Sequence, residues 1–278
     1  MTEPVDTVIK VGGSILRDEQ GYRSVAEHLR PWIERGSWVV VSAARGVTDE
    51  LERLSASPRV GPARRLIDRH SEWAGEPLAE ELALELEALA RAASPALGPL
   101  LSWGERASAA CLSARLAALG FPVPVVELPR HGPPEGRSAS IVPGFYLRDE
   151  DGRAILLPRG GSDISAVLLA ARLGAREVRF WKDGGGVQDL EDPATIVSEI
   201  DSGELLERLG NSTRPLHPEA LRLALEAGVE LVLEEPVLRR PATRVRHRAT
   251  GTSAALSTAD SSDRPAGAAP EFPARWAP

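Results

Sequence analysis

The chain has 278 residues, of which 42% are hydrophobic and 26% are charged, so it has the length and composition of a folded globular protein with a substantial core. Its net charge of -7 argues against a broad surface for nucleic acid or anionic membranes, and no apolar run approaches the roughly 18 residues that span a bilayer. The single cysteine, Cys111, excludes an intrachain disulfide, and the acidic N-terminus lacks a basic signal region, so we expect a cytoplasmic protein with a small-molecule partner.

The first predicted elements alternate between strand and helix. An apolar, β-branched run, Thr7–Val11, ends at Gly12-Gly13 and is typical of a buried strand that enters a tight loop. An amphipathic stretch at residues 21–35 and a second apolar run at 38–41 follow it. This order of strand, helix and strand predicts a parallel sheet that is covered by helices.

The middle of the chain is mainly helical in pattern. Helical periodicity covers four stretches, at residues 49–54, 63–73, 79–93 and 105–119. Three short strands are predicted after them, at residues 123–126, 140–142 and 154–157. The last two flank a charged turn at 148–153, so we expect a hairpin with local antiparallel pairing.

A second alternation follows, with helices at residues 166–173, near 203–209 and at 218–227, and strands at 177–181 and 229–233. The predicted fold class is therefore α/β. After Glu235 the periodicity is lost and Pro, Ala, Ser, Thr and Arg dominate, a composition that buries too little apolar area to offset the entropy of ordering. We expect residues 236–278 to form a flexible tail. Its basic segment, 239–248, is interpreted as solvated rather than as a contact for phosphate or an acidic partner.

Two glycine-rich segments have the features of phosphate-binding loops. In Lys10-Val-Gly-Gly-Ser14 a cation ends a strand, and two glycines let backbone N–H groups approach an anion closely. The alternative is a plain turn, and the segment is not a Walker A motif. In Arg159-Gly-Gly-Ser-Asp163 a cation and two glycines precede an apolar helix, whose free N–H groups attract anions. Helix capping alone does not require the arginine and glycines, so the two loops together favour phosphate chemistry.

Two further segments offer groups for a polar substrate. Ser42 and Thr48 supply hydroxyl groups after the second predicted strand. Glu105 supplies a carboxylate in the first turn of a predicted helix. A glutamate at that position most often only complements the helix dipole, so Glu105 taken alone would be structural.

Taken together and in this order, these segments resemble the catalytic domain of the aspartokinases, members of the amino-acid kinase superfamily. The matching segments are 10–14, 39–49, 101–108, 143–145, 159–163 and 216–218, and the resemblance extends from about residue 7 to 235. It implies a three-layer αβα sandwich around a mainly parallel sheet, the amino-acid kinase fold. It also divides the domain, 1–235, into an acceptor-binding lobe at 1–150 and a nucleotide-binding lobe at 151–235.

The resemblance further implies a role for each matching residue. Lys10 would neutralise the transferring phosphoryl group and Asp163 would organise the site, which makes these two the candidate catalytic residues. The candidate acceptor-binding residues are Arg159 for a carboxylate, Glu105 for the ammonium group, and Ser42, Thr48 and Ser162. The candidate nucleotide-binding residues are Gly12, Gly13, Ser14, Gly160, Gly161, Asp183 and Arg214. No residue is assigned as a metal ligand.

The reaction that the resemblance implies is transfer of the γ-phosphoryl group of ATP, with Mg2+, to the side-chain carboxylate of L-aspartate. Such a transfer depends on positioning and charge neutralisation, and the acceptor carboxylate is already ionised at neutral pH, so no general base is needed. His217 is therefore expected to be structural. The resemblance also implies a homodimer. The chain leaves no room for the paired ACT domains of most aspartokinases, so we expect no direct feedback by lysine or threonine.

Four residues depart from the family pattern near the predicted site. Pro158 replaces a glycine and fixes the backbone before the second glycine loop, and Arg45 adds a large cation to a loop of small residues. Gly185 replaces an acidic residue and Gln188 an aromatic one in the nucleotide loop. Two alternatives therefore stay open: a kinase for another amino acid or small carboxylate, and a non-catalytic nucleotide-binding regulatory subunit.

Overall fold

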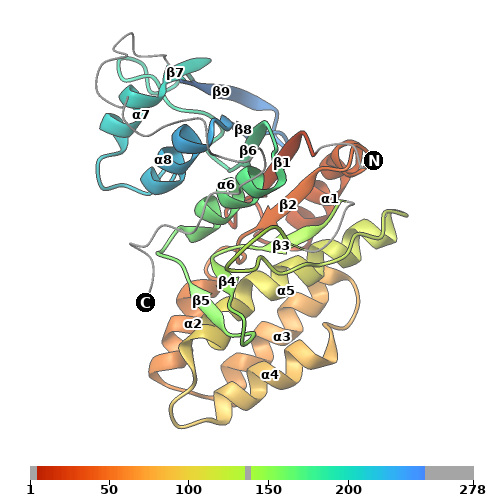
Figure 1. Ribbon diagram of the computed structural model, residues 1–278. Helices are drawn as coiled ribbons and strands as arrows, with labels where there is room; N and C mark the ends of the chain where they lie inside the picture. The colour runs from red at the N-terminus through yellow and green to blue at the C-terminus, as the bar shows by residue number, and fades with distance from the viewer. Residues whose placement is uncertain (1–4, 135–138, 248–278) are drawn as a thin grey trace.

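The computed structural model describes residues 5–134 and 139–247, which form a seven-stranded sheet with helices on both faces (Figure 1). The strands lie in the order β3 (Ile141–Pro143), β2 (Trp38–Val41), β1 (Thr7–Val11), β6 (Glu177–Trp181), β8 (Glu230–Glu235), β9 (Arg240–Arg246) and β7 (Glu199–Asp201). Neighbouring strands run parallel except β8 and β9. The predicted α/β class with a mainly parallel sheet is confirmed.

Two groups of helices enclose the sheet. On one side lie α1 (Glu19–Ile33), α2 (Val47–Ala56), α3 (Val60–Ala74), α4 (Glu80–Arg91) and α5 (Leu97–Ala118). On the other side lie α6 (Gly161–Leu173), α7 (Ser202–Leu209) and α8 (Pro218–Ala227).

Side chains of β1 alternate between the two hydrophobic cores that result. Ile9 and Val11 pack in the core with α1 to α5, and Val8 packs in the core with α6 and α8. Every residue of β1 is buried, as expected for a strand of a parallel sheet covered on both faces. Lys10 lies on the same side of the strand as Val8, so its side chain faces α6.

The strand order changes direction between β1 and β6. From β1 the chain proceeds outward through β2 to β3, and from β6 it proceeds through β8 toward the opposite edge. The carboxyl ends of β1 and β6 therefore lie at a topological switch point, the place where open α/β sheets bind ligands. Lys10 and Trp181 stand at these strand ends.

Three predictions for the middle of the chain are wrong in detail. The hairpin pairs β4 (Tyr146–Arg148) with β5 (Ala154–Leu156), whereas residues 141–143 form β3 and pair with β2. The expected strand at 123–126 contributes only an isolated bridge from Val125 to Ile141. Helix α5 begins at Leu97 rather than Glu105, because Pro99 lies in its first turn, where a helix needs no N–H donor.

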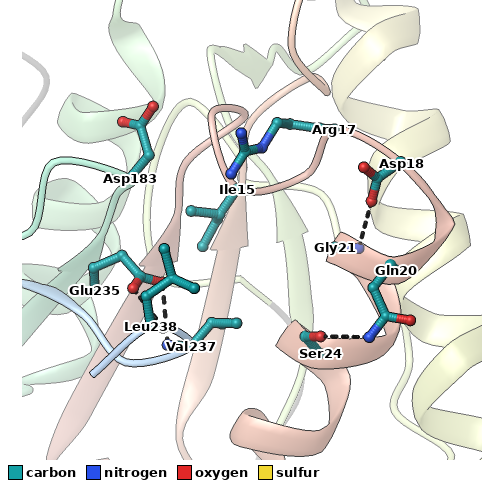
Figure 2. Close-up of a pocket in the computed structure, with 10 residues that line it drawn as sticks. All are labelled: Ile15, Arg17, Asp18, Gln20, Gly21, Ser24, Asp183, Glu235, Val237 and Leu238. Carbon is teal, nitrogen blue, oxygen red and sulfur yellow. Dashed lines mark hydrogen bonds between the residues drawn. The ribbon is translucent and has the colours of Figure 1, made fainter. Parts of the chain in front are cut away.

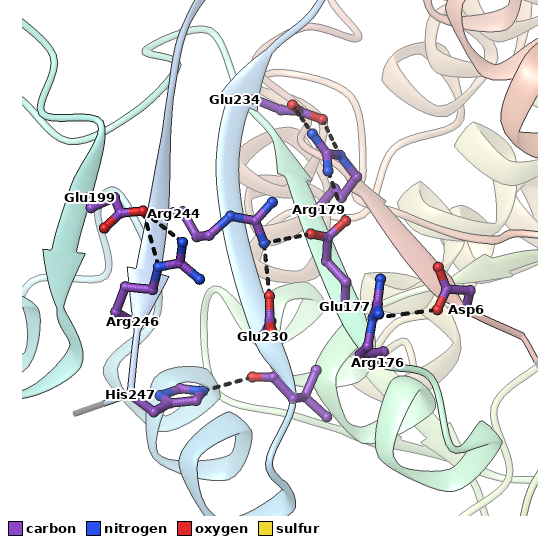
Figure 3. Close-up of polar contacts among 11 residues, drawn as sticks. Asp6, Arg176, Glu177, Arg179, Glu199, Glu230, Glu234, Arg244, Arg246 and His247 are labelled. Carbon is purple, nitrogen blue, oxygen red and sulfur yellow. Dashed lines mark hydrogen bonds and ion pairs between the residues drawn. The ribbon is translucent and has the colours of Figure 1, made fainter. Parts of the chain in front are cut away.

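The prediction of a flexible tail from residue 236 is wrong for Arg240–Arg246, which forms β9. Thr243 and Val245 point into the core, and β9 pairs with β8 on one side and β7 on the other. The arginines between them are neutralised by glutamates from other strands: Arg244 contacts Glu177 and Glu230, and Arg246 contacts Glu199 (Figure 3). Composition alone did not predict this strand, because the glutamates that neutralise its arginines lie in other segments of the sequence. The rest of the predicted tail, from residue 248, lies outside the described residues.

Candidate active site

A buried cluster of two lysines and one aspartate lies at the switch point. Lys10 Nζ lies 2.9 Å from Asp163 Oδ1, and Lys182 Nζ lies 2.8 Å from Asp163 Oδ2. Lys10 comes from β1, Lys182 directly follows β6, and Asp163 stands in the first turn of α6. Asp163 Oδ2 also accepts the backbone N–H of His217 at 3.1 Å. Three segments of the chain are thus fixed by one carboxylate.

The charges of this cluster are strongly perturbed. Burial alone would raise the pKa of Asp163, but the adjacent Lys10 and Lys182 lower it to about 2, so it is ionised at neutral pH. Burial lowers the pKa of Lys182 to about 8, against the opposing effect of Asp163. Two ammonium groups share a single carboxylate, so the cluster carries an excess of positive charge. An anion such as a phosphoryl group would neutralise it.

The first glycine loop lies directly beside this cluster. Gly12 donates its N–H to the carbonyl of Trp181 at 2.9 Å, and a Cβ atom on Gly13 would stand 2.1 Å from the carbonyl oxygen of Ala43. Ser14 Oγ accepts the backbone N–H of Asp183 at 3.3 Å. Glycine is therefore required here because the loops after β1, β2 and β6 touch.

The second glycine loop forms the start of α6. Gly160 has a φ of 88°, the left-handed region that favours glycine, and no side chain caps the helix at this residue. A Cβ atom on Gly161 would lie 2.5 Å from Cβ of Leu157. Ser162 and Asp163 follow as buried residues of the first turn. The positive end of the α6 dipole therefore points at the lysine cluster.

The candidate acceptor side is formed by α5 and the loop after β2. Glu105 is only 4% exposed, burial raises its pKa to about 8, and it accepts a hydrogen bond from the backbone of Ala43. Its Oε2 atom has no hydrogen-bond partner among the described residues. Ser42 and Thr48 are partly buried at either end of the same loop. A ligand with an ammonium group would satisfy the buried carboxylate.

The backbone of this acceptor loop is held from the side of α5. Ser108 Oγ accepts the N–H of Ala44 at 3.1 Å and the hydroxyl of Tyr22 at 2.9 Å. A Cβ atom on Gly104 would stand 2.9 Å from the side chain of Ala43. The glycine before Glu105 thus lets α5 approach the loop closely enough for Glu105 to reach it.

Several predicted residues are not brought into the cluster. Arg159 is exposed and pairs with Asp49 and Glu52 of α2, and Arg214 is exposed near Lys182. Arg45 is exposed and has no ion-pair partner among the described residues. Gly185 has a φ of 67°, and a Cβ atom there would lie 3.2 Å from Cβ of Arg240, which explains the glycine at this departure from the family pattern.

Asp183 is joined to the first glycine loop by its backbone, but its side chain lines a different cavity (Figure 2). This cavity, of about 270 Å³, lies between the β1–α1 loop and the turn after β8. Its apolar lining includes Ile15, Val237 and Leu238. It is on the α1 side of the sheet, away from the face that carries the lysines.

The sequence-based assignment missed Lys182. The composition contained a signal for Lys182. Lys10 and Lys182 are the only lysines in the chain, and every other residue in its total of 33 lysines and arginines is an arginine. The structure agrees with the structural role expected for His217. The side chain of His217 caps α8 by accepting the N–H of Glu219, and burial raises the pKa of the Cys111 thiol to about 12.

Within residues 5–134 and 139–247, no group of three or more His, Cys, Asp or Glu side chains could hold a metal ion by itself. Mg2+ usually binds through one or two carboxylates together with substrate phosphates, so the residues present are compatible with an ion that enters with a nucleotide. Across the same residues, none of the helices has both the length and the apolar character to cross a bilayer.

Comparison with known proteins identifies the wider group. The model of the amino acid kinase family matches residues 7–233. The aspartokinase of Thermus thermophilus is 30% identical over 268 residues, which cover 86% of this chain and 58% of that protein. The chain thus spans less than two thirds of the length of this relative.

Solved structures show the same fold. E. coli aspartokinase III in complex with lysine and aspartate superposes with a TM-score of 0.72 at 24% identity, over 88% of this chain and 66% of that chain. The carbamate kinase of Giardia lamblia bound to AMP-PNP has a TM-score of 0.54 at 13% identity, over 89% of this chain and 100% of that chain.

Proposed function

The chain belongs to the amino acid kinase family, and on that premise we propose that it transfers the γ-phosphoryl group of ATP to the side-chain carboxylate of L-aspartate. The observation that carries the proposal is the buried cluster in which Lys10 and Lys182 share the carboxylate of Asp163. It combines an excess of positive charge with a glycine loop and the start of α6. This is the arrangement that phosphoryl transfer needs.

The donor side of the proposed reaction is formed by Lys10, Lys182 and the two glycine loops. The two ammonium groups stabilise the negative charge that spreads over the transferring group, and Asp163 keeps them in place before substrate binds. Backbone N–H groups at Gly13 and the start of α6 bind phosphate oxygens, whereas Gly12 contributes its small size, since its own N–H is donated to the carbonyl of Trp181. When bound with the nucleotide, Mg2+ supplies further neutralisation of phosphate charge.

The acceptor side is formed by Glu105, the 42–48 loop and the residues that begin α6. Glu105 accepts the ammonium group of the amino acid, Ser42, Thr48 and Ser162 offer hydroxyl groups, and Arg159 binds the carboxylate that is not phosphorylated. An ionised carboxylate attacks without losing a proton, so the site requires no general base. Aspartate is proposed because the Thermus thermophilus relative, which is 30% identical over 268 residues, is named an aspartokinase.

A second candidate function is a kinase for another amino acid or small carboxylate. It is favoured by the exposed Arg45 in the loop after β2, whose guanidinium has no ion-pair partner within residues 5–134 and 139–247, and by Pro158 before the second glycine loop. The carbamate kinase neighbour shows that the fold is not restricted to one acceptor.

A hydroxylamine trap tests the proposal. The full chain is incubated with Mg-ATP and a panel of acids that includes aspartate and glutamate, and an acyl phosphate is detected as its hydroxamate. We expect a signal with aspartate that is lost in Lys10→Ala, with circular dichroism confirming that the variant is folded. A signal with another acid alone supports the second candidate. Nucleotide binding without any hydroxamate supports the non-catalytic alternative.

The regulation and assembly of the chain are part of the proposal. We expect lysine and threonine to leave the activity of the 278-residue chain unchanged. We also expect a homodimer, which sedimentation velocity measures directly. Inhibition by either amino acid would contradict the first expectation.

A further inference from the structure

Arg159, the proposed ligand of the acceptor's carboxylate, is already bound to two carboxylates of the protein. Its Nη2 atom donates to Asp49 Oδ1 at 2.5 Å, and its Nη1 atom donates to Glu52 Oε1 at 3.5 Å. The three side chains are exposed by 71%, 47% and 46%, respectively. The contacts therefore lie at the protein surface, where a solute can reach them.

The two carboxylates come from one face of α2. Asp49 and Glu52 are three residues apart, and residues with this spacing are neighbours on a helix surface. Thr48, in the first turn of α2, belongs to one wall of the proposed acceptor site, and Arg159 precedes α6, which supplies the other wall. The two ion pairs therefore connect the walls of that site.

The chemistry of this contact is the chemistry proposed for substrate binding. A guanidinium binds a carboxylate most strongly when two parallel N–H groups meet both of its oxygens. Asp49 and Glu52 each supply a single oxygen to Arg159, so neither forms that bidentate pair. Exposed ion pairs contribute little to stability, so a free carboxylate can replace them without disturbing the fold.

We propose that Asp49 and Glu52 form a carboxylate latch, which holds Arg159 across the acceptor site until the carboxylate of the acceptor displaces it. The inference rests on the proposed function. Asp49 and Glu52 are then positioning residues that act through Arg159 and oppose acceptor binding without entering the transfer step. The latch favours acceptors with a second carboxylate besides the one that is phosphorylated, because only these compete for the guanidinium.

Steady-state kinetics of latch variants test the inference. With Mg-ATP and aspartate, Asp49→Asn and Glu52→Gln are each expected to lower KM for aspartate about 2- to 5-fold with kcat unchanged, as the loss of an exposed competing pair implies. The matched control is Asp151→Asn, which breaks an exposed pair with Arg153 at 2.9 Å in the β4–β5 turn and is expected to leave KM unchanged. An unchanged or raised KM in both latch variants overturns the inference.

A double-mutant comparison separates a latch from a general effect on α2. In an Arg159→Ala background, Asp49→Asn is expected to have no further effect on kcat/KM for aspartate, because the latch acts only through the guanidinium. An equal gain from Asp49→Asn in both backgrounds would overturn the inference.

A chemical probe tests the latch without turnover. Phenylglyoxal modifies accessible guanidinium groups, and modification of Arg159 is followed by peptide mass spectrometry. The Asp49→Asn/Glu52→Gln chain is expected to react faster at Arg159 than the wild type, and equal rates would contradict the latch. A wild type that forms no aspartyl phosphate counts instead against the proposed function, and the phenylglyoxal rates then decide the latch independently.

Discussion

Lys10 and Lys182 are the only two lysines in a chain that has 33 lysine and arginine residues, and both contact Asp163. Elsewhere the chain uses arginine where a surface ion pair needs a cation. A lysine ammonium is a compact point charge, whereas a guanidinium is planar and larger, so the two are not interchangeable at a buried site. The pattern indicates that these two positions require the smaller cation.

Replacement of Lys182 tests this requirement. Lys182→Met is expected to lower kcat about 100- to 1000-fold in the hydroxamate assay, the loss typical of one charge-stabilising donor in a transition state. The chain remains folded because Lys10 still neutralises Asp163. Lys182→Arg is also expected to be impaired, and Arg153→Met, a surface control, is expected to be fully active. Unimpaired turnover by Lys182→Met would remove this residue from the proposed site.

Glu105 makes acceptor binding depend on pH. Burial raises its pKa to about 8, yet an ammonium group requires the ionised form. Below this pKa, binding must release a proton, so KM for aspartate is expected to rise about tenfold for each unit of acidification. Lys182→Met is expected to retain this slope where its activity can be measured, and Glu105→Gln is expected to lose it. A KM that is constant between about pH 6 and pH 8 would contradict this role of Glu105.

The raised pKa of Glu105 also affects stability. Its contribution to the free energy of unfolding changes with pH in the opposite direction to that of most carboxylates. Between the ordinary pKa of 4.5 and about 8, the folded chain holds a proton on Glu105 that the unfolded chain has released. The contribution of Glu105 to the free energy of unfolding therefore falls as pH rises through this window. Glu105→Gln removes that decline, which urea denaturation at several pH values measures.

At the residue scale, the predictable part of the site was the part carried by local motifs. Lys10 and Asp163 each stand in a glycine-rich segment, and the fold brings them to within 2.9 Å. Lys182 has no such local motif, and only the pairing of β1 with β6 places it beside Asp163. The ion pairs of Arg159 were equally unpredictable, because Asp49 is 110 residues away in sequence.

At the element scale, β9 is the strand that the amino-acid composition failed to predict. Thr243 is fully buried in this strand, and its hydroxyl donates to the carbonyl of Val197 at 2.6 Å and accepts the N–H of Val187 at 2.7 Å. The strand therefore ties the nucleotide loop after β6 to the sheet. Only two inward-facing residues mark it, Thr243 and Val245, which is too short a pattern to overcome the surrounding arginines and prolines.

Thr243→Val tests the contribution of β9. The change preserves shape but leaves a buried carbonyl and a buried N–H without their partner, so the free energy of unfolding is expected to fall by about 1–3 kcal/mol. Thr243→Ser, which keeps the hydroxyl, is expected to lose less. Urea denaturation measures both, and a loss below roughly 0.5 kcal/mol in Thr243→Val would show that β9 contributes little.

Elements with clear boundaries were predicted closely, and those without them were not. The predicted bounds of β1, β2, β6 and α8 agree with the structure, because each strand is a short apolar run with polar or glycine residues after it and Pro218 marks the start of α8. The pairing of β4 with β5 was missed because Tyr146–Arg148 is too short to show alternation. That β4 is the partner strand of β5 could be assigned only from the three-dimensional arrangement.

At the scale of the whole molecule, the sheet joins parts of the chain that the sequence presents as separate. The proposed acceptor-binding lobe, 1–150, and nucleotide-binding lobe, 151–235, remain a proposal about function. In the structure, β1 and β6 pair along their whole length, and the cluster of Lys10, Lys182 and Asp163 spans that pairing. Order along the chain predicted the α/β class, but the switch point between β1 and β6 follows from the strand order, which local patterns do not specify.

This arrangement predicts that the two hydrophobic cores unfold together. Val8 and Ile9 are adjacent in β1 yet pack in opposite cores, so loss of either core removes support for the same strand. Ile9→Ala is expected to cost about 2–5 kcal/mol, and Val8→Ala somewhat less, because each leaves a cavity. In both variants, far-UV circular dichroism and tryptophan fluorescence should give one coincident urea transition at a lower midpoint, with an unchanged slope.

The tryptophans report on both cores, since Trp38 lies in one core and Trp73 and Trp103 lie in the other. Two separated transitions, with each substitution moving only one of them, would instead show that the cores are independent folding units. In that case the lysine cluster would be assembled by docking of two preformed parts rather than by folding of one sheet.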